Sequence, residues 1–434
     1  MKRKMNKKMN KKMGAIALSV LLSLSVAGCS AQEESSSETQ TTITNVASTM
    51  NESSATNGTS TTNGSSSGLS TEAIADAAST SILSSTEGSA LDTSELFSER
   101  DLEQSADLSG ATYISLESEK DITIDTEGVY VLSGKVENVT VTVEAAEDAK
   151  VQIVLDGVSI TNVNSPAIYV KAADKVFITT TDSENNMQVT GSFVADGDTN
   201  LDAVIYSKAD LTLNGTGSLS IISNEGNGIT SKDDLKVTGG VYTIQTAVDG
   251  MEANDGILIY DGEFTINSGK DAILSENEED DSQGFIYIHN GSFQITAADD
   301  AIQGNSIVQI DGGIINIESC TEGIEGTYIQ INEGELTLYA TDDGINATSK
   351  SSYDVKLEVN GGTINVTMGS GDTDAFDANG DLIINGGTIT VEAQSAFDSD
   401  GTAELNGGDV TVNGEIITQI TQSQMGGGRG KGNH

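Results

Sequence analysis

The sequence of 434 residues is poor in several residue types on which common folds and sites depend. Tryptophan is absent, proline occurs once, aromatic residues make up 4% of the chain, and there are two cysteines and two histidines. So few cysteines and histidines do not support a zinc or copper site, which needs a cluster of these ligands. The 47 glycines, together with many Val, Ile and Thr, favour short strands joined by tight turns. The composition therefore indicates an all-β protein.

Basic residues are also scarce. The 66 Asp and Glu outnumber the 21 Lys and Arg, and the formal net charge is −45. A surface this acidic repels phosphate backbones, so we expect no binding of nucleic acid. It attracts divalent cations and, through them, other polyanions.

Residues 1–28 are predicted to be the signal peptide of a lipoprotein. A basic start precedes an apolar stretch from Gly14 to Ala27, which is too short to span a membrane. The stretch ends in Leu-Ser-Val-Ala-Gly before Cys29, and small residues before a cysteine resemble the lipobox of bacterial lipoproteins. We therefore expect a secreted protein that an acylated Cys29 anchors to the outer face of a bacterial cell membrane. An ordinary signal peptide followed by a coincidental cysteine is the alternative.

The segment from Cys29 to residue 100 has the composition of a disordered linker. It is rich in Ser, Thr, Asn and Gln and has almost no large apolar side chain, so it buries too little surface to offset the entropy of ordering. The Gly-rich residues 421–434 are expected to be a flexible tail. Between these two segments, residues 101–420 are predicted to form one domain.

A motif with a period of about 21–22 residues repeats from position 202 onward. Most copies have an acid, then Gly or Ala, then an apolar residue, as in Asp249-Gly-Met, with insertions near residues 276–283 and 348–355. A second motif, such as Asn360-Gly-Gly, follows the same rhythm between alternating strands. Each period holds about three strands and no helical pattern, which predicts a single-stranded parallel β-helix with one coil per 21–22 residues. The usual hand of β crossovers predicts a right-handed coil.

Stacked coils place equivalent residues in columns about 4.8 Å apart. The first motif therefore predicts a column of acids that begins at Asp202, and the position three residues later supplies a second column. Neighbouring carboxylates at this spacing repel each other unless protons, hydrogen bonds or cations intervene. Oxygen-rich sites suit Ca²⁺. We predict calcium ligands at Asp249, Glu252, Asp271, Asp299, Asp300, Glu322, Glu325, Asp342, Asp343, Asp374 and Asp377.

The alternative for these acids is a purely structural role at the corners of the coils. Asp or Asn before Gly commonly accepts hydrogen bonds from nearby backbone N–H groups. For Asp261, Asn290, Asp311 and Asn385, which belong to the second motif, this structural role is the favoured interpretation.

Several features in a fixed order resemble the bacterial carbohydrate-binding parallel β-helix family. They are the lipobox, the Ser/Thr-rich spacer, the segments Leu155-Asp-Gly-Val-Ser-Ile and Ala167-Ile-Tyr-Val, and the Asp-Gly-Ile and Asn-Gly-Gly coils. The resemblance covers about residues 105–415. It implies a calcium-binding surface protein with a fold similar to that of polysaccharide lyases, which binds polygalacturonate and cellulose without cleaving them. We also expect a monomer.

A calcium-dependent polyuronate lyase is the rival hypothesis. Such lyases abstract the proton α to a uronate carboxylate with Lys or Arg as the base. No arginine lies between residues 101 and 428, which leaves Lys270 as the candidate base, with Lys208 and Lys232 as weaker candidates. The favoured interpretation of Lys270 is nevertheless a solvated corner residue paired with nearby acids. A third hypothesis is a calcium-stiffened structural stalk or adhesin, which suits the linker and the solenoid equally well.

Overall fold

The computed structural model describes residues 90–371 and 373–420. The predictions for residues 1–28, for Cys29, for the linker as far as residue 89 and for the tail at 421–434 lie outside the described residues. Within the described part, the one helical element is the short 3-10 turn η1 (Thr93–Glu95), and no helix is long and apolar enough to cross a membrane. The prediction of an all-β protein is confirmed.

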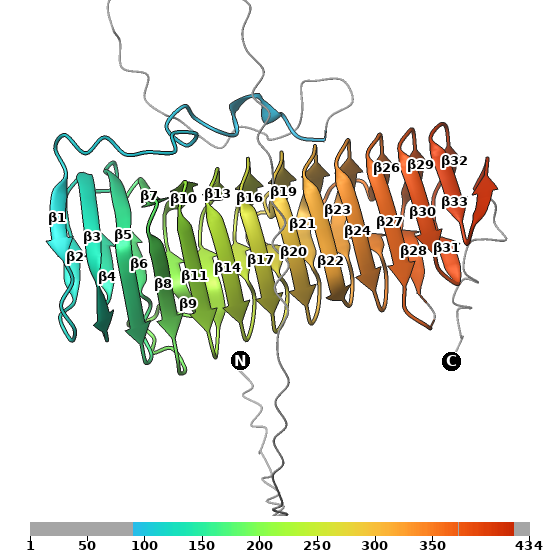
Figure 1. The fold of residues 1–434 in the computed structure, drawn as a ribbon. Coiled ribbons are helices and arrows are strands. Elements are labelled where there is room, and N and C mark those ends of the chain that lie inside the picture. The colour runs from blue at the N-terminus through green and yellow to red at the C-terminus, as the bar shows by residue number, and fades with distance from the viewer. Residues whose placement is uncertain (1–89, 372, 421–434) are drawn as a thin grey trace, which may run out of the picture. The chain divides into compact units, whose positions relative to one another are not determined.

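The strands form a parallel β-solenoid with three sheets, and Figure 1 shows its coils side by side along the length of the molecule. Sheet 1 contains β1 (Thr112–Ser115), β3 (Gly128–Glu137), β5 (Lys150–Asn162), β7 (Lys175–Thr180), β10 (Asp210–Gly215), β13 (Leu235–Val237), β16 (Gly256–Ile259), β19 (Phe285–Ile288), β21 (Ile302–Ile310), β23 (Ile324–Ile331), β26 (Lys356–Val359), β29 (Asp381–Ile384) and β32 (Ala403–Leu405). The single-stranded parallel β-helix that the repeat predicted is confirmed, while its right hand stays a prediction.

The other two sheets follow the same order along the solenoid. Sheet 2 begins with the second halves of β3 and β5 and continues with β8 (Glu184–Val189), β11 (Ser218–Ser223), β14 (Val241–Thr246), β17 (Glu263–Ser268), β20 (Ser292–Ala297), β22 (Ile314–Cys320), β24 (Glu335–Ala340), β27 (Thr363–Met368), β30 (Thr388–Glu392) and β33 (Asp409–Val412), with β34 (Glu415–Ile417) antiparallel at its end. Sheet 3 contains the first halves of β21 and β23 together with β2 (Ile122–Ile124), β4 (Val141–Glu144), β6 (Ile168–Ala172), β9 (Ala203–Ser207), β12 (Asn227–Ser231), β15 (Met251–Ala253), β18 (Ile273–Ser275), β25 (Ile345–Ala347), β28 (Asp374–Ala378) and β31 (Ser395–Phe397).

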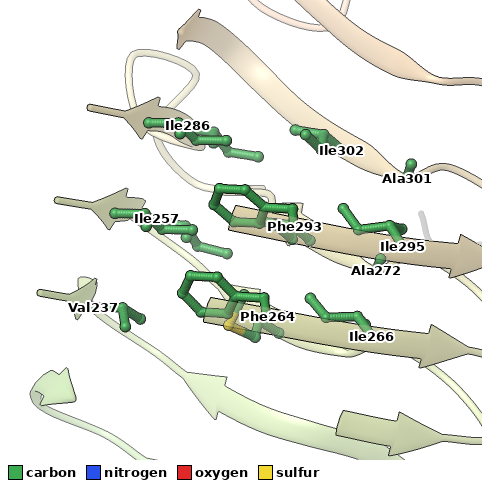
Figure 2. Close-up of a cluster of buried hydrophobic side chains, with 14 of the residues drawn as sticks. Val237, Ile257, Phe264, Ile266, Ala272, Ile286, Phe293, Ile295, Ala301 and Ile302 are labelled. Atoms are coloured by element: carbon green, nitrogen blue, oxygen red, sulfur yellow. The ribbon is translucent and has the colours of Figure 1, made fainter. Parts of the chain in front are cut away.

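One hydrophobic core runs through the coils because every second strand residue points inward. Equivalent side chains stack from coil to coil. Tyr242, Phe264 and Phe293 lie in register in sheet 2, with ring centroids 5.5 and 4.7 Å apart, and Figure 2 shows the last two above one another. Outward residues are stacked in the same way, so the register that builds the core also builds columns on the surface.

Tight corners keep the coils short. Gly387 of the Asn385-Gly-Gly corner has a φ of 94°, and a Cβ there would lie 3.0 Å from the Gly361 oxygen of the coil below. Only glycine adopts this conformation in so little space without strain. This requirement explains why Gly-Gly recurs with the period of the coil.

Residues 90–107 form a strap along the outer side of sheet 1, seen along the upper edge of the solenoid in Figure 1. Gln330 and Gln309 accept hydrogen bonds from the backbone N–H groups of Ala90 and Leu91, at 2.9 and 2.8 Å. Farther along, the buried Asp101 pairs with Lys175 at 2.7 Å. The boundary expected at residue 101 therefore lies inside a packed segment, and residues 90–100 belong with the solenoid rather than with the linker.

Both predicted insertions lie at the corner between sheet 3 and sheet 1. Residues 276–283 follow β18, residues 348–355 follow β25, and the Tyr353 hydroxyl donates to the Ser282 carbonyl at 3.4 Å. One position of the predicted register is wrong: Asn227 pairs with Ala203, not with Asp202. The coil between them is longer than the regular repeat, so counting from the motif misplaced Asp202 by one residue.

Candidate metal centre

The first acidic column lies where the chain passes from sheet 2 into sheet 3. One carboxylate oxygen of each of three acids accepts the backbone N–H of the next coil: Asp249 from Asp271 at 3.1 Å, Asp271 from Asp300 at 3.0 Å, and Asp343 from Asp374 at 3.0 Å. The structural interpretation of these corners is therefore correct for one oxygen of each of these three acids. The second oxygen of Asp271 accepts a hydrogen bond from the Lys270 ammonium at 2.9 Å.

The small residue after each acid follows from the same close approach. A Cβ on Gly250 would lie 2.5 Å from the Ala272 oxygen, and one on Gly344 would lie 2.5 Å from the Ala375 oxygen. Real Cβ atoms do not come so near to backbone oxygen. Glycine at these two positions thus lets the coils stack closely enough for each carboxylate to reach the next N–H group.

The second acidic column projects from the outer face of sheet 3. Strand pairing aligns Glu252 with Leu274, Leu274 with Gln303, and the column continues through Glu325, Asn346 and Asp377. This is the order expected from the repeat. The two columns run side by side because their members lie three residues apart on each coil.

Two groups of three carboxylates come close enough to hold one metal ion each. In each group the ligand oxygens lie within 4.8 Å of one another, and Asp300 belongs to both groups. The first group adds Asp271 and Asp299 to Asp300, and the second adds Glu322 and Glu325. These are the groups of three or more potential metal-binding side chains found among the described residues. Together they contain five of the eleven predicted ligands.

The electrostatics around Asp300, the acid that the two groups share, disfavour its charged form. Burial and the charges of Glu322, Glu325, Asp271 and Asp299 raise the pKa of Asp300 to about 9. Burial and the Glu325 charge likewise raise the pKa of Glu322 to about 7. Each carboxylate would be more stable with a proton or a cation than as a bare anion.

Asn346 adds a neutral oxygen to the second group. Its amide nitrogen donates to Glu322 at 3.0 Å, whereas its amide oxygen is buried and has no hydrogen-bond partner among the described residues. The side chain is 7% exposed, and its neighbours in the column are Glu325 and Asp377. Carboxylate and amide oxygens are the donors that Ca²⁺ prefers. The residues present therefore fit a calcium ion.

A lysine already neutralises part of this group. The Lys350 ammonium, from the insertion at residues 348–355, forms an ion pair with one oxygen of Glu325. Glu325 thus shares its charge between the lysine and the neighbouring acids, which leaves Asp300 and Glu322 as the carboxylates with the greater need of a cation.

The remaining predicted ligands have other surroundings. Glu252 is held by Lys232 at 2.9 Å and by Asn227 at 2.6 Å, and Asp342 is exposed. Burial and the charges of Asp343, Asp374 and Asp398 raise the pKa of Asp377 to about 7. These acids of the last coils influence one another, but the structure does not bring them together as a group of three ligands.

Lys270 lies among the acids as an ion-pair partner. Its ammonium is 2.9 Å from Asp271 and 3.9 Å from Asp249. Burial alone would lower the pKa of Lys270, but the hydrogen bond to Asp271 and the charges of Asp249, Asp271 and Asp299 outweigh burial and raise it. A lysine in this state holds its proton tightly, which is the opposite of what a general base needs.

A further column of acids lies at the corner between sheet 3 and sheet 1 and was not foreseen. Burial and the Asp233 charge raise the pKa of Asp210 to about 6, and the Asp233 pKa rises because of burial and Asp255. The Asn277 amide donates to Asp255 at 2.7 Å. The repeated Ser-Lys-x-Asp at residues 207–210 and 231–234 was the available signal.

Comparison with known proteins places this chain in a family. A carbohydrate-binding domain-containing protein of Acetivibrio thermocellus is 37% identical over 126 residues, which are 28% of this chain and 44% of that relative. The chain thus matches less than half the length of this relative. The solved structure of a polysaccharide lyase-like protein from C. thermocellum, a gadolinium derivative, has 24% sequence identity and a TM-score of 0.40, and the match covers 70% of this chain and 94% of the other.

The family model for carbohydrate-binding domain-containing proteins matches residues 118–373 and 325–415. Together the two matches cover nearly all of the solenoid and well over half of the chain. The chain belongs to the family of carbohydrate-binding domain-containing proteins.

Proposed function

We propose that this protein is a calcium-dependent, non-catalytic carbohydrate-binding lipoprotein that holds acidic polysaccharide such as polygalacturonate at the cell surface. The observation that carries the proposal is the pair of carboxylate groups that share Asp300, with the buried oxygen of Asn346 beside the second group. Membership of the carbohydrate-binding family supports a polysaccharide as the ligand.

Each residue has a definite part in this proposal. Asp300, Glu322, Glu325 and Asn346 would hold one ion. Asp271, Asp299 and Asp300 would hold a second ion, with the exposed Asp299 on its solvent side. Bound calcium supplies a positive charge that carboxylates of the protein and of a uronate can share. Such sharing explains how a protein with a net charge of −45 could hold a polyanion.

Binding on immobilised polygalacturonate tests the proposal directly. We expect the full chain, purified in detergent, to be retained in calcium and released by EDTA. The double variant Asp300→Asn/Glu322→Gln should lose retention, because amides cannot supply the charge that calcium requires. Glu252→Gln is the matched control, since Lys232 already occupies the Glu252 carboxylate. Equal retention in calcium and EDTA would contradict the calcium bridge, and failure in both buffers would favour a structural stalk.

The absence of catalysis is a separate part of the proposal. The high pKa of Lys270 speaks against a role as the base of a lyase. Incubation of the protein with polygalacturonate and calcium should therefore give no unsaturated product by ultraviolet absorbance. Product that appears with the natural chain and vanishes in Lys270→Gln would establish the lyase instead.

Surface anchoring rests on the sequence around Cys29. We expect the natural chain to partition into the detergent phase and the Cys29→Ala variant to partition into the aqueous phase. Cellulose, the second ligand implied by the resemblance, is uncharged and would gain nothing from a calcium bridge. It would need another surface.

A further inference from the structure

We propose that Lys350 is an exchangeable counterion of the second carboxylate group. It holds Glu325 in the absence of calcium, and once calcium binds it turns to a carboxylate of the bound polyuronate. The inference rests on the proposed function, because it assigns to one lysine the exchange between the metal ion and the acidic polysaccharide. It is derived from the ion pair, from the loop that carries the lysine and from a contrast with other ion pairs of the solenoid.

Lys350 belongs to the insertion at residues 348–355, and the start of this insertion is fixed to the solenoid. The backbone N–H groups of Lys350 and Ser351 both donate to the Thr327 hydroxyl, each at 3.0 Å. Thr327 is fully buried, and its hydroxyl donates in turn to the Asn305 carbonyl at 2.8 Å. These bonds hold the backbone of Lys350 beside the second group, so its ammonium acts there at a high effective concentration even when the side chain swings.

The ion pair of Lys350 lies at the boundary between the acids and the solvent. The ammonium pairs with one oxygen of Glu325, and the two side chains are 24% and 9% exposed. Glu325 is also one of the three ligands of the second group. A calcium ion in that group would draw on the charge of Glu325 and would add positive charge near the ammonium, and both effects weaken the ion pair. Because the lysine has a flexible four-carbon stem, its ammonium can then turn to the solvent side.

Two other lysines show that this exchange is not a general property of the ion pairs. Lys232 pairs with Glu252 of sheet 3 at 2.9 Å, and Lys356 pairs with Glu358 of sheet 1 at 2.8 Å. Neither glutamate belongs to the two groups of three ligands. Calcium in these groups would therefore leave both pairs intact. Of these three lysines, Lys350 is the one that a metal ion would release.

Lys270 is the corresponding lysine of the first group, but it is more exposed. Its side chain is 47% exposed, against 24% for Lys350. Solvent therefore screens more of the interaction between Lys270 and Asp271. We expect the exchange at Lys350 to have the larger effect on binding.

A released ammonium has a partner in the proposed ligand. A polyuronate has a carboxylate on each sugar, and a chain bridged by calcium at the second group brings such carboxylates close to Lys350. The ammonium offers three donors and a positive charge to them. It also offsets, at this point of the surface, the net charge of −45 that repels a polyanion. Lys350 would thus weaken the binding of calcium alone but strengthen the binding of an acidic polysaccharide.

The variant Lys350→Gln tests the exchange in the full chain, purified in detergent. Isothermal titration without polysaccharide should show calcium binding about tenfold tighter, because the competing ammonium is gone. Retention on immobilised polygalacturonate in saturating calcium should be about tenfold weaker, because the uronate has lost its partner. Lys350→Arg keeps the charge and should restore retention. Lys356→Gln is the matched control, since it removes a lysine of similar exposure, 29%, from a pair outside both groups, and it should change neither affinity.

Opposite changes of the two affinities in Lys350→Gln would establish the exchange. Tighter calcium binding with unchanged retention would overturn it, because Lys350 would then only compete with the ion. Weaker or unchanged calcium binding would also overturn it, because the lysine would then organise the site or lie apart from it. In each of these cases the natural chain would still be retained in calcium and released by EDTA, so the proposed function would stand. A natural chain without calcium-dependent retention would overturn both.

Discussion

Two columns on the same solenoid have equal spacing and opposite chemistry. At the corner between sheet 1 and sheet 2, Asn360, Asn385 and Asn406 each donate to the amide oxygen one coil below, at 2.8, 2.9 and 3.0 Å. Asn332 begins this amide ladder by donating to Asp311 at 2.7 Å. At the corner between sheet 2 and sheet 3, the equivalent positions are mostly carboxylates.

The difference lies in what each side chain can offer its neighbour. An amide carries a donor and an acceptor, so one amide per coil completes a chain of hydrogen bonds without any outside group. An ionised carboxylate has only acceptors, so a stack of carboxylates must take donors from the backbone or charge from a cation. The amide ladder therefore satisfies its own hydrogen bonds, whereas the acidic columns depend on backbone donors, on lysines or on the calcium proposed above.

Asp101 is a useful contrast to the acidic columns because a lysine of the same chain neutralises it. Lys175 lies 2.7 Å away, and the two side chains are 1% and 10% exposed. Although burial alone would raise its pKa, Lys175 and hydrogen bonds from Ser98 lower the pKa of Asp101 to about 2, whereas the pKa of Asp300 rises to about 9. The pKa of a buried aspartate is thus lowered where a lysine lies beside it and raised where its neighbours are other acids.

We expect Asp101→Asn to have the largest effect on stability, a loss of about 3 kcal/mol at neutral pH, because it leaves the buried Lys175 charge unpaired. Denaturant unfolding would measure it. Asp107→Asn, which removes the charge of an exposed carboxylate in the same strap, is the control and should change little. A loss no larger than that of the control would mean that the strap contributes little to the fold.

The acid dependence of the same pair provides a second test. The folded pKa of Asp101 lies below its usual 3.8, so the folded state binds fewer protons there than the unfolded state. Its contribution, about 2 kcal/mol, is therefore present above pH 4 and is lost as the pH falls toward 2. Unfolding of the natural chain and of Asp101→Asn across this range should converge at low pH. If the stabilities of the two proteins differed by the same amount at every pH, the lowered pKa of Asp101 would be contradicted.

Chelation should have the next largest effect, and it should act on the acidic columns but not on the amide ladder. Calcium at about 100 times its dissociation constant stabilises a protein that binds it only when folded by about 2.7 kcal/mol. EDTA should therefore lower the melting temperature of the natural chain. Asp300→Asn should abolish this dependence, yet melt higher than the natural chain in EDTA, because the buried amide needs neither a proton nor a cation to be neutral. A melting temperature that is the same with and without EDTA would contradict the proposed calcium site.

A carboxylate placed in the amide ladder should destabilise the fold, because it brings two acceptor oxygens together as in the acidic columns. Asn360→Asp removes the donor that now reaches Asn332 and sets two oxygens against each other. We expect a loss of about 1–2 kcal/mol at neutral pH, the scale of a buried hydrogen bond left unmade. Protonation restores the donor, so most of this loss should disappear near pH 3. Asn267→Asp, on an exposed strand position outside the ladder, is the control.

The sequence predicts the solenoid and its columns well because the repeat carries both. Once Asp-Gly-Ile and Asn-Gly-Gly keep one period, stacking follows, and the neighbours of Asp300 can be named before the fold is known. The strap could not be predicted, since residues 90–107 have no repeat and Asp101 meets Lys175 only through the tertiary fold. The role of Asn346 also depended on its surroundings, because a column position does not reveal which oxygen lacks a partner.

The variant Lys270→Gln is expected to have the smallest effect, and it tests whether a lysine and a metal ion compete for the same acids. The Lys270 ammonium would compete with the proposed calcium ion for Asp271, but the side chain is 47% exposed, so solvent screens much of its charge. Lys270→Gln should therefore change stability by less than 1 kcal/mol and strengthen calcium binding at most about fivefold, which isothermal titration can resolve. The acidic column would then behave as a site that accepts either a lysine or a metal ion, as the amide ladder cannot. Weaker calcium binding in Lys270→Gln would mean that the lysine organises the site rather than competing for it.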